Sequence, residues 1–90
     1  MKYKFIWHAD PGHEWLEVRH DLIQALGIEN LISKYSYISR DGSLVYLEGD
    51  CDAEPLLEVL KNKGAEVETS VREWSNLCPI RTMRRYRGAV

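Results

Sequence analysis

The first part of the chain alternates aromatic and other residues with the period of an extended strand. In KYKFIWH, residues 2–8, every second residue is aromatic, which is typical of a β-strand. WLEV, residues 15–18, is a second and shorter run of β-forming residues. Between them Asp10-Pro11-Gly12 favours a turn, because proline presets φ at its second position, glycine accepts a positive φ at its third, and aspartate accepts hydrogen bonds from nearby amides. We therefore expect a hairpin over residues 2–18.

The next segment has the spacing of an amphipathic helix. Leu22, Ile23 and Leu26 recur at helical intervals and share one face. Gly27 followed by Ile28 is typical of a Schellman end, in which glycine adopts a left-handed conformation and the next apolar residue packs back onto the helix.

A second amphipathic helix is predicted in the middle of the chain. LLEVL, residues 56–60, presents one apolar face, and Gly64 ends the helix. Asp50 and Asp52 both suit an N-cap, and Glu54 suits the positive end of the helix dipole.

Three further β-like runs surround this helix. KYSYIS, residues 34–39, and SLVYLE, residues 43–48, flank Asp41-Gly42, and Asp-Gly between two such runs is the strongest short hairpin signal. Residues 65–74 alternate again, with valine and threonine on one side and charged or small polar residues on the other. This alternation predicts a final strand with one solvent-exposed face.

The predicted order of elements is therefore β-β-α-β-β-α-β. It favours an α+β two-layer sandwich, in which a mostly antiparallel sheet carries both helices on one face. Ninety residues make a single domain. We place that domain at residues 1–78, because Pro79 cannot continue a strand ladder, and interpret residues 79–90 as a basic C-terminal tail.

The composition favours a globular protein without a membrane segment. The hydrophobic fraction is 44%, yet no apolar run reaches the roughly 18 residues of a membrane span. The N-terminal residues before Asp10 are too short an apolar stretch for a signal peptide. We therefore expect an intracellular, cytoplasmic protein in which Cys51 and Cys78 are reduced thiols rather than a disulfide.

The net charge of −2 conceals an asymmetry along the chain. Residues 1–70 carry 7 Lys and Arg against 13 Asp and Glu, a net charge of −6. Residues 71–90 carry 5 Arg and 1 Glu, a net charge of +4. The body is acidic and the C-terminal end is basic, so the two parts suit different partners.

The segment HADPGH, residues 8–13, admits two interpretations. His8, Asp10 and His13 could ligate zinc or iron through two imidazoles and a carboxylate. Turn geometry already explains the central residues, however, and the histidines would have to converge across the turn and recruit a ligand that no motif marks. We favour the turn, and a metal or proton-transfer site is the alternative.

A second candidate site combines the tyrosines of the predicted hairpin over residues 34–48 with the acidic run at residues 48–58. This run could hold a divalent cation, although it lacks the register of an EF-hand, or it could present an anionic face to a basic partner. Helix capping and a solvated face are the alternative explanation. Tyrosine often dominates binding interfaces, and a sheet face left uncovered by helices would expose these rings, whereas core packing is the alternative. The predicted partner-binding residues are Tyr35, Tyr37, Tyr46, Glu48, Asp50, Asp52 and Glu54.

The third candidate is the C-terminal sequence PIRTMRRYRGAV. Arginine pairs with phosphates, and an aromatic ring among arginines can stack on a nucleic-acid base. A tail that folds back onto the acidic body, or a disordered basic end, explains the same residues. The predicted nucleic-acid-binding residues are Arg81, Arg84, Arg85, Tyr86 and Arg87.

The chain carries no motif of an established enzyme class. It lacks a G-x-S-x-G elbow, a P-loop and a dinucleotide-binding glycine pattern. Cys51 lies at the predicted start of a helix, whose dipole lowers a thiol pKa, but the flanking aspartates raise it again. We therefore assign no catalytic residue, predict no cofactor, and expect a non-enzymatic protein.

Several short motifs run in a fixed order from Trp7 to about Arg81, namely HADPGH-x-WLEV, LGI, ISKYSY, VYLEGDCDA and PIR. In these motifs the chain resembles a family of small uncharacterised proteins encoded by bacteriophages, prophages and related mobile elements. Glu14 stands where that family often has glycine, and Gly49 stands where it often has an acidic residue. The resemblance implies a biological setting rather than an activity, and small accessory phage proteins often bind and block a host protein.

The sequence as a whole supports three functional hypotheses. The first is a non-enzymatic phage or mobile-element protein that binds a host protein or protein–nucleic acid complex, for instance as a counter-defence inhibitor. The second is a nucleic-acid-binding module that uses the C-terminal arginines. The third is a metal-dependent enzyme built on His8, Asp10 and His13.

Overall fold

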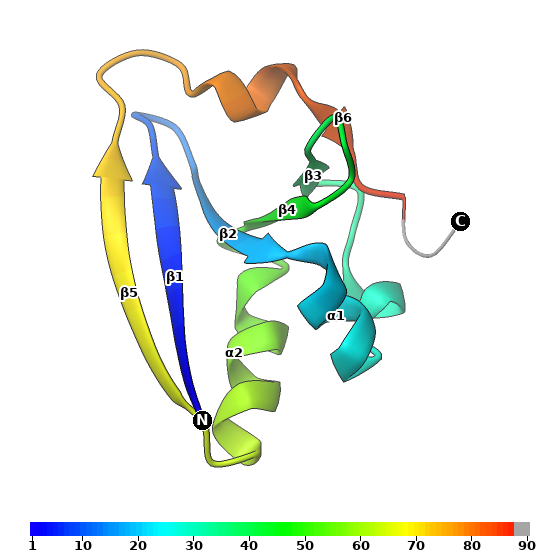
Figure 1. Ribbon diagram of the computed structural model, residues 1–90. Coiled ribbons are helices and arrows are strands. Elements are labelled where there is room, and N and C mark those ends of the chain that lie inside the picture. The colour runs from blue at the N-terminus through cyan, green and yellow to red at the C-terminus, as the bar shows by residue number, and fades with distance from the viewer. Residues whose placement is uncertain (88–90) are drawn as a thin grey trace.

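The computed structural model describes residues 1–87, and its elements follow the predicted order with one short strand added at the end (Figure 1). The α+β class is thereby confirmed. Single 3₁₀ turns are labelled η. The elements are β1 (Lys2–Ala9), β2 (Glu14–Arg19), α1 (His20–Leu26), η1 (Glu29–Leu31), β3 (Tyr37–Ile38), β4 (Leu44–Glu48), α2 (Ala53–Asn62), β5 (Glu66–Glu73), η2 (Pro79–Thr82) and β6 (Arg84–Arg85).

One six-stranded sheet contains every strand of residues 1–87, in the order β5-β1-β2-β4-β3-β6. Four of its five neighbouring pairs are antiparallel, as expected. The exception is β5, which reaches the edge of the sheet after the α2 crossover and runs parallel to β1 over eight residue pairs, from Lys2↔Glu66 to Ala9↔Glu73. Parallel pairing follows because a crossover helix returns the chain to the end at which β1 begins.

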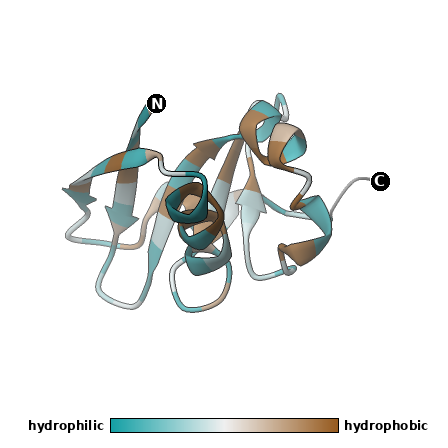
Figure 2. Ribbon diagram, turned by 90° about the horizontal axis from the view of Figure 1, so that it is seen from below, coloured by the Kyte–Doolittle hydropathy of each residue, from teal (hydrophilic) through white to brown (hydrophobic). Residues whose placement is uncertain are grey.

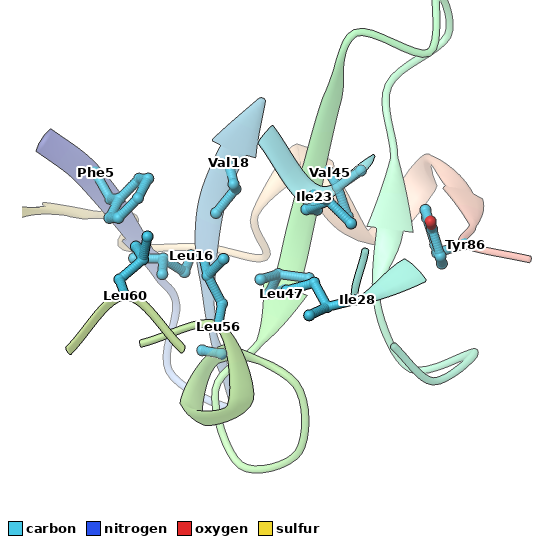
Figure 3. Packing of buried hydrophobic residues seen from close by; sticks show 11 residues of the cluster. Phe5, Leu16, Val18, Ile23, Ile28, Val45, Leu47, Leu56, Leu60 and Tyr86 are labelled. Carbon is cyan, nitrogen blue, oxygen red and sulfur yellow. The ribbon is translucent and has the colours of Figure 1, made fainter. Parts of the chain in front are cut away.

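The main core lies between the sheet and the two helices, which cover the same face as predicted. Successive side chains of a strand point to opposite faces, so β2 and β4 each direct alternate residues toward the helices. Leu56 and Leu60, one turn apart on α2, pack against this face, and Ile23 packs from α1 (Figure 3). Figure 2 shows hydrophobic residues gathered on the central strands. The sheet residues of this core are Phe5, Leu16, Val18, Val45 and Leu47.

Local signals placed the turns correctly. Gly27 has a φ of 67° and the Ile28 N–H donates to the Ile23 carbonyl, which is the Schellman arrangement. In the second hairpin Gly42 has a φ of 79°, while the Asp41 carboxylate accepts hydrogen bonds from the residues on either side of the turn.

The strand before that turn is shorter than predicted. Only Tyr37–Ile38 pairs with β4, because the preceding residues leave the sheet. The Ser36 hydroxyl is buried and donates to the Asp52 carboxylate, which also accepts the N–H and hydroxyl of Ser33. Asp52 occupies the N-cap position of α2, yet its side chain makes no capping hydrogen bond. Its carboxylate instead ties the 33–36 segment to the start of the helix.

The predicted tail is part of the domain. From the end of β5 the chain crosses to the opposite edge of the sheet, where β6 pairs with β3 (Figure 1). It covers the face that the helices leave open, where Cys78 and Ile80 form a second small core with Trp15 and Tyr46. Residue 78 is therefore not a structural boundary, because apolar residues on both sides of it are buried together. Residues 88–90 of the predicted tail lie outside the described residues.

No helix within residues 1–87 is long and apolar enough to cross a membrane. Cys51 is exposed and Cys78 is buried, and both are free thiols in this structure.

Candidate partner-binding site

A pocket of about 340 Å³ opens where the C-terminal segment, residues 78–87, crosses the ends of β2, β3 and β4. It draws residues from all three groups that the sequence analysis singled out, because the 8–13 turn, the acidic run and the arginine-rich segment meet there. We call it the composite pocket. Its lining residues are His13, Trp15, Tyr35, Tyr37, Glu48, Asp50, Cys51, Arg81 and Arg85.

Asp10 organises one side of this pocket from below the surface. Its Oδ1 accepts the backbone N–H groups of Gly12 and His13, so the predicted aspartate turn is confirmed. Its Oδ2 accepts the Cys78 N–H, and Arg81 donates to both oxygens, at 2.6 Å from Nε and 2.9 Å from Nη2. The Arg81 guanidinium and these N–H donors hold the pKa of Asp10 well below its usual range, although burial opposes them.

Gly12 has a different role from the predicted one. Its φ is not positive, so the turn does not require glycine for its backbone conformation. A Cβ at this position would lie 2.9 Å from Arg81 Nη2 and 3.8 Å from Asp10 Oδ1. Glycine is therefore favoured because a guanidinium fixed by Asp10 passes directly over the turn, a contact that no local pattern reveals.

The two pocket arginines each lie over an aromatic ring. The Arg81 guanidinium carbon is 5.1 Å from the centre of the Trp15 ring, and that of Arg85 is 5.2 Å from the centre of the Tyr37 ring. The two rings meet edge to face at 6.1 Å. Because the stacked groups lie within cation–π range, the arginines and rings form one continuous wall. Tyr35 completes this wall at the rim, where 54% of its surface is exposed.

The opposite wall is acidic. The Glu48 side chain is only 10% exposed, and it accepts the Asp50 N–H. His13 Nδ1 lies 3.7 Å from Glu48 Oε1, and no lysine or arginine within residues 1–87 forms an ion pair with either carboxylate. Hydrogen bonding to Glu48, aided by the nearby acids, raises the pKa of the Cys51 thiol. This wall presents negative charge and an exposed thiol whose pKa is raised.

The predicted metal triad is not assembled. His8 lies on β1 with its Nε2 3.0 Å from Glu17 Oε1, while Asp10 is occupied by Arg81. His13 instead faces Glu48 and Asp50, and one ligand atom from each of these three lies within 4.8 Å of the others. Among residues 1–87 this is the only such group of potential metal ligands. An imidazole and two carboxylates are ligands that a divalent cation accepts.

The predicted partner-binding residues separate into accessible and buried ones. Tyr35, Tyr37, Glu48 and Asp50 line the composite pocket, and Glu54 is exposed on α2. Tyr46 and Asp52 are buried, at 6% and 2% exposure, and neither lines the pocket, so neither is placed to contact a partner there. Tyr46 is covered by the C-terminal segment, a long-range contact that the alternation of the strand does not encode.

The predicted nucleic-acid-binding residues also separate. Tyr86 is 2% exposed with its hydroxyl 3.3 Å from His20 Nε2, so its ring is unavailable to a base, and Arg81 is paired with Asp10. The remaining three arginines are exposed, and β6 brings two of them to the segment that carries Lys34 and Arg40, where Arg85 donates to the Lys34 carbonyl and Arg84 to the Ser39 carbonyl. We call this group the basic edge. None of its members forms an ion pair within residues 1–87, and they are Lys34, Arg40, Arg84, Arg85 and Arg87.

The sequence does not reveal the residue contacts that build the pocket. His13, Glu48 and Arg81 belong to three different predicted sites, since no spacing pattern links segments so far apart in the chain. No protein-family model matches the chain, and neither a curated protein nor a solved structure is significantly similar to it.

Proposed function

We propose that this chain is a non-enzymatic protein that binds a partner protein through the composite pocket. The observation that carries the proposal is the composition of the pocket walls, where Tyr35, Tyr37, Arg81 and Arg85 stand against the buried ring of Trp15. Tryptophan, tyrosine and arginine are the residues that contribute most to protein interfaces. Four of the five are held by mutual stacking, so little conformational entropy is lost when a partner binds.

The charges of the pocket indicate which group of the partner enters it. Glu48 and Asp50 have no lysine or arginine partner within residues 1–87, and the exposed ring of Tyr35 lines the same space. A lysine or arginine side chain of the partner would pair with the carboxylates and lie against this ring. The pocket volume of about 340 Å³ is sufficient for one such side chain.

The biological partner that fits this proposal is a host protein, alone or in a complex with nucleic acid. The resemblance to small phage and mobile-element proteins supports a host partner in the bacterial cytoplasm. If that partner belongs to a defence system, the chain would act as a counter-defence inhibitor by occupying its basic surface. The acidic body, with a net charge of −6 over residues 1–70, would steer it toward a basic surface.

Affinity capture with pocket variants tests this proposal. Asp50→Lys reverses the charge at the rim and Tyr35→Ala removes the exposed ring, whereas Glu58→Lys makes the same charge change on α2 outside the pocket. A protein captured from bacterial lysate by the wild type is then titrated in purified form. We expect either pocket variant to weaken binding by roughly tenfold or more, and Glu58→Lys to leave it unchanged. Equal binding by all three variants would overturn the proposal.

The basic edge favours a second candidate function, the binding of single-stranded nucleic acid. Five cations without carboxylate partners can contact successive phosphates, and Tyr35 offers a ring for stacking. Five phosphate contacts predict a slope of about −3.5 for log affinity against log salt concentration. Deletion of residues 79–90 is not a clean test, because Ile80 and Tyr86 are buried in the domain.

Charge reversal within the folded chain separates this function from the first. Fluorescence anisotropy with a labelled oligonucleotide would compare the wild type with Arg84→Glu/Arg87→Glu and with Lys61→Glu, which lies on α2. Loss of binding in the double variant alone supports nucleic-acid recognition by the basic edge. Absence of salt-dependent binding by the wild type would exclude it.

A further inference from the structure

No strand within residues 1–87 pairs with the outer edge of β5, which is free along the whole length of the strand in the described part of the chain (Figure 1). The N–H of Glu66 donates to Met1 and that of Trp74 donates to Ala9, so the even-numbered residues direct their backbone groups toward β1. The odd-numbered residues between them therefore direct their N–H and carbonyl groups outward. These residues are Val67, Thr69, Val71 and Glu73.

This edge lacks most of the features by which sheet proteins prevent strand pairing. Natural edges are shortened, bulged, interrupted by proline, or lined with charged side chains, lysine above all. Four of the eight β5 residues are charged, but they carry both signs. The eight residues of β5 contain neither proline nor lysine, and their pairing with β1 runs without interruption. Val71 is also 61% exposed on this strand. The edge is therefore long and regular enough to accept another strand.

We propose that β5 pairs antiparallel with β5 of a second copy of this chain, with Thr69 opposite Thr69. The two sheets then form one continuous twelve-stranded sheet about a two-fold axis through that pair. In this register each outward-directed residue lies opposite another outward-directed residue, so every pair exchanges two backbone hydrogen bonds. The occupant is a second copy because the side chains of β5 complement themselves on both faces of the sheet.

On the helix-covered face the register joins two apolar rows. Val67 of one copy lies opposite Val71 of the other, on both sides of the axis. Within each chain Val67 is the register partner of Tyr3, and Val71 is the register partner of Trp7. The exposed Val71 is thereby enclosed between Trp7 of its own chain and Val67 of the second copy.

On the other face the register pairs opposite charges. Glu66 of one copy lies opposite Arg72 of the other, twice in the dimer. Neither residue forms an ion pair within residues 1–87, and Arg72 is held over the Trp74 ring at 4.2 Å. The dimer therefore neutralises two charges that the single chain leaves uncompensated.

Neighbouring registers are less favourable. A shift of the second strand by two residues in one direction places Glu68 opposite Glu68. The same shift in the other direction places Val67 opposite Glu73, although it pairs Glu68 with Arg72. Only the register centred on Thr69 pairs apolar residues on one face and opposite charges on the other.

Sedimentation equilibrium on the full chain tests the proposal over about 10 to 500 µM, because a single strand pair buries less than a standard interface and should give a weak dimer. We expect a monomer–dimer equilibrium in the wild type. Arg72→Glu and Glu66→Arg each place like charges opposite one another, and each should raise the dissociation constant by roughly tenfold or more. Their combination restores both ion pairs in exchanged positions and should restore the dimer.

Two further variants test the register of the strand pair and its backbone hydrogen bonds. Glu68→Arg lies opposite Ser70 in this register and should leave the dimer unchanged, whereas it would weaken the dimer in the register that pairs Glu68 with Arg72. Thr69→Pro removes an outward N–H at the axis without removing a bond to β1, and should give a monomer with an unchanged near-ultraviolet circular dichroism spectrum. A wild type that is monomeric at every concentration overturns self-pairing and leaves the edge to a strand of another protein. A dimer that all these variants retain, or that the charge exchange fails to restore, also overturns the proposal.

Discussion

The carboxylate of Asp10 and the guanidinium of Arg81 form a two-point ion pair across 71 positions of sequence, with contacts of 2.6 and 2.9 Å. The Asp10 side chain has no exposed surface, whereas that of Arg81 is 28% exposed. The same carboxylate accepts backbone N–H groups from the turn and from Cys78. One residue thus closes the β1–β2 turn and attaches the C-terminal segment that forms one wall of the composite pocket.

Substitution of this carboxylate should therefore destabilise the domain. Asp10→Asn keeps the volume of the side chain but removes its charge and places an NH₂ group against one of its donors. We expect a loss of about 2–3 kcal/mol in the free energy of unfolding, because hydrogen bonds to charged groups contribute more than neutral ones. Urea unfolding measures the effect. The exposed Glu14→Gln serves as the matched control and should change stability by less than about 0.5 kcal/mol.

The same pair predicts how stability depends on pH. Arg81 holds the pKa of Asp10 below its usual value, which is about 3.9 in an unfolded chain. The folded state therefore binds fewer protons than the unfolded state in this range, so the stabilisation is fully present above about pH 5 and is lost as the pH falls further. We expect the free energy of unfolding, measured with urea between pH 2 and 7, to fall less steeply with decreasing pH in Asp10→Asn than in the wild type. Some loss should remain, because hydrogen bonds from Ser43 and Ser39 lower the pKa of Asp41 to about 2. Identical acid profiles would refute this assignment.

Gly12→Ala tests whether Arg81 is the reason for glycine in the turn. The added Cβ would lie 2.9 Å from the guanidinium, and we expect a cost of about 1–2 kcal/mol from overpacking. In an Arg81→Ala background the same substitution should cost almost nothing. A double-mutant cycle by urea unfolding measures this difference directly. Equal costs in both backgrounds would mean that the backbone, rather than the arginine, requires glycine.

Substitution of the two aspartates that flank Cys51 should change the stability of the domain by very different amounts. Asp52 is buried and binds Ser33 and Ser36, and the Ser36 hydroxyl in turn accepts the Glu48 N–H. Asp52→Ala leaves these buried donors unpaired and should cost about 2–4 kcal/mol of stability. Asp50→Ala, on an exposed side chain, should change stability by less than about 0.5 kcal/mol. Thermal unfolding of both variants gives the comparison, and similar melting temperatures would contradict the assigned role of Asp52.

The two thiols should also differ in reactivity. Cys51 is exposed, so iodoacetamide should modify it in the folded chain, whereas the buried Cys78 should react only after unfolding. Hydrogen bonding to Glu48 raises the pKa of Cys51, so the rate should reach half its maximum at a higher pH than for an unperturbed thiol. Glu48→Gln should shift this midpoint downward. Mass spectrometry of the labelled peptides follows both sites, and an unshifted midpoint would contradict the contact.

Features governed by neighbouring residues were predictable from the sequence. Gly27 and Gly42 adopt the left-handed conformation that their helix-end and hairpin patterns require. The turn at Asp10 was also predicted, because an aspartate that accepts the next amides is a local arrangement. In contrast, the expected positive φ at Gly12 was wrong, since the constraint there comes from Arg81 rather than from the turn.

The candidate site could be predicted only in fragments. The tyrosines, the acidic run and the arginines were each recognised, but Tyr46 and Tyr86 were assigned to surfaces and are buried. A two-residue alternation reveals that a strand has two faces without revealing what covers them. The covering segment comes from a region that the arginine-rich composition marked as a tail, although Ile80 anchors it in the second core.

The sequence by itself determined the element order, the α+β class and the main turns, because helix periodicity, strand alternation and turn chemistry act over a few residues. Only the tertiary structure decided which segments meet. It brought Arg81 to Asp10, placed His13 beside Glu48, and left β5 at an open edge of the sheet. Such contacts join residues tens of positions apart, and they form because burial and charge compensation act through space, where spacing along the chain carries no record of them.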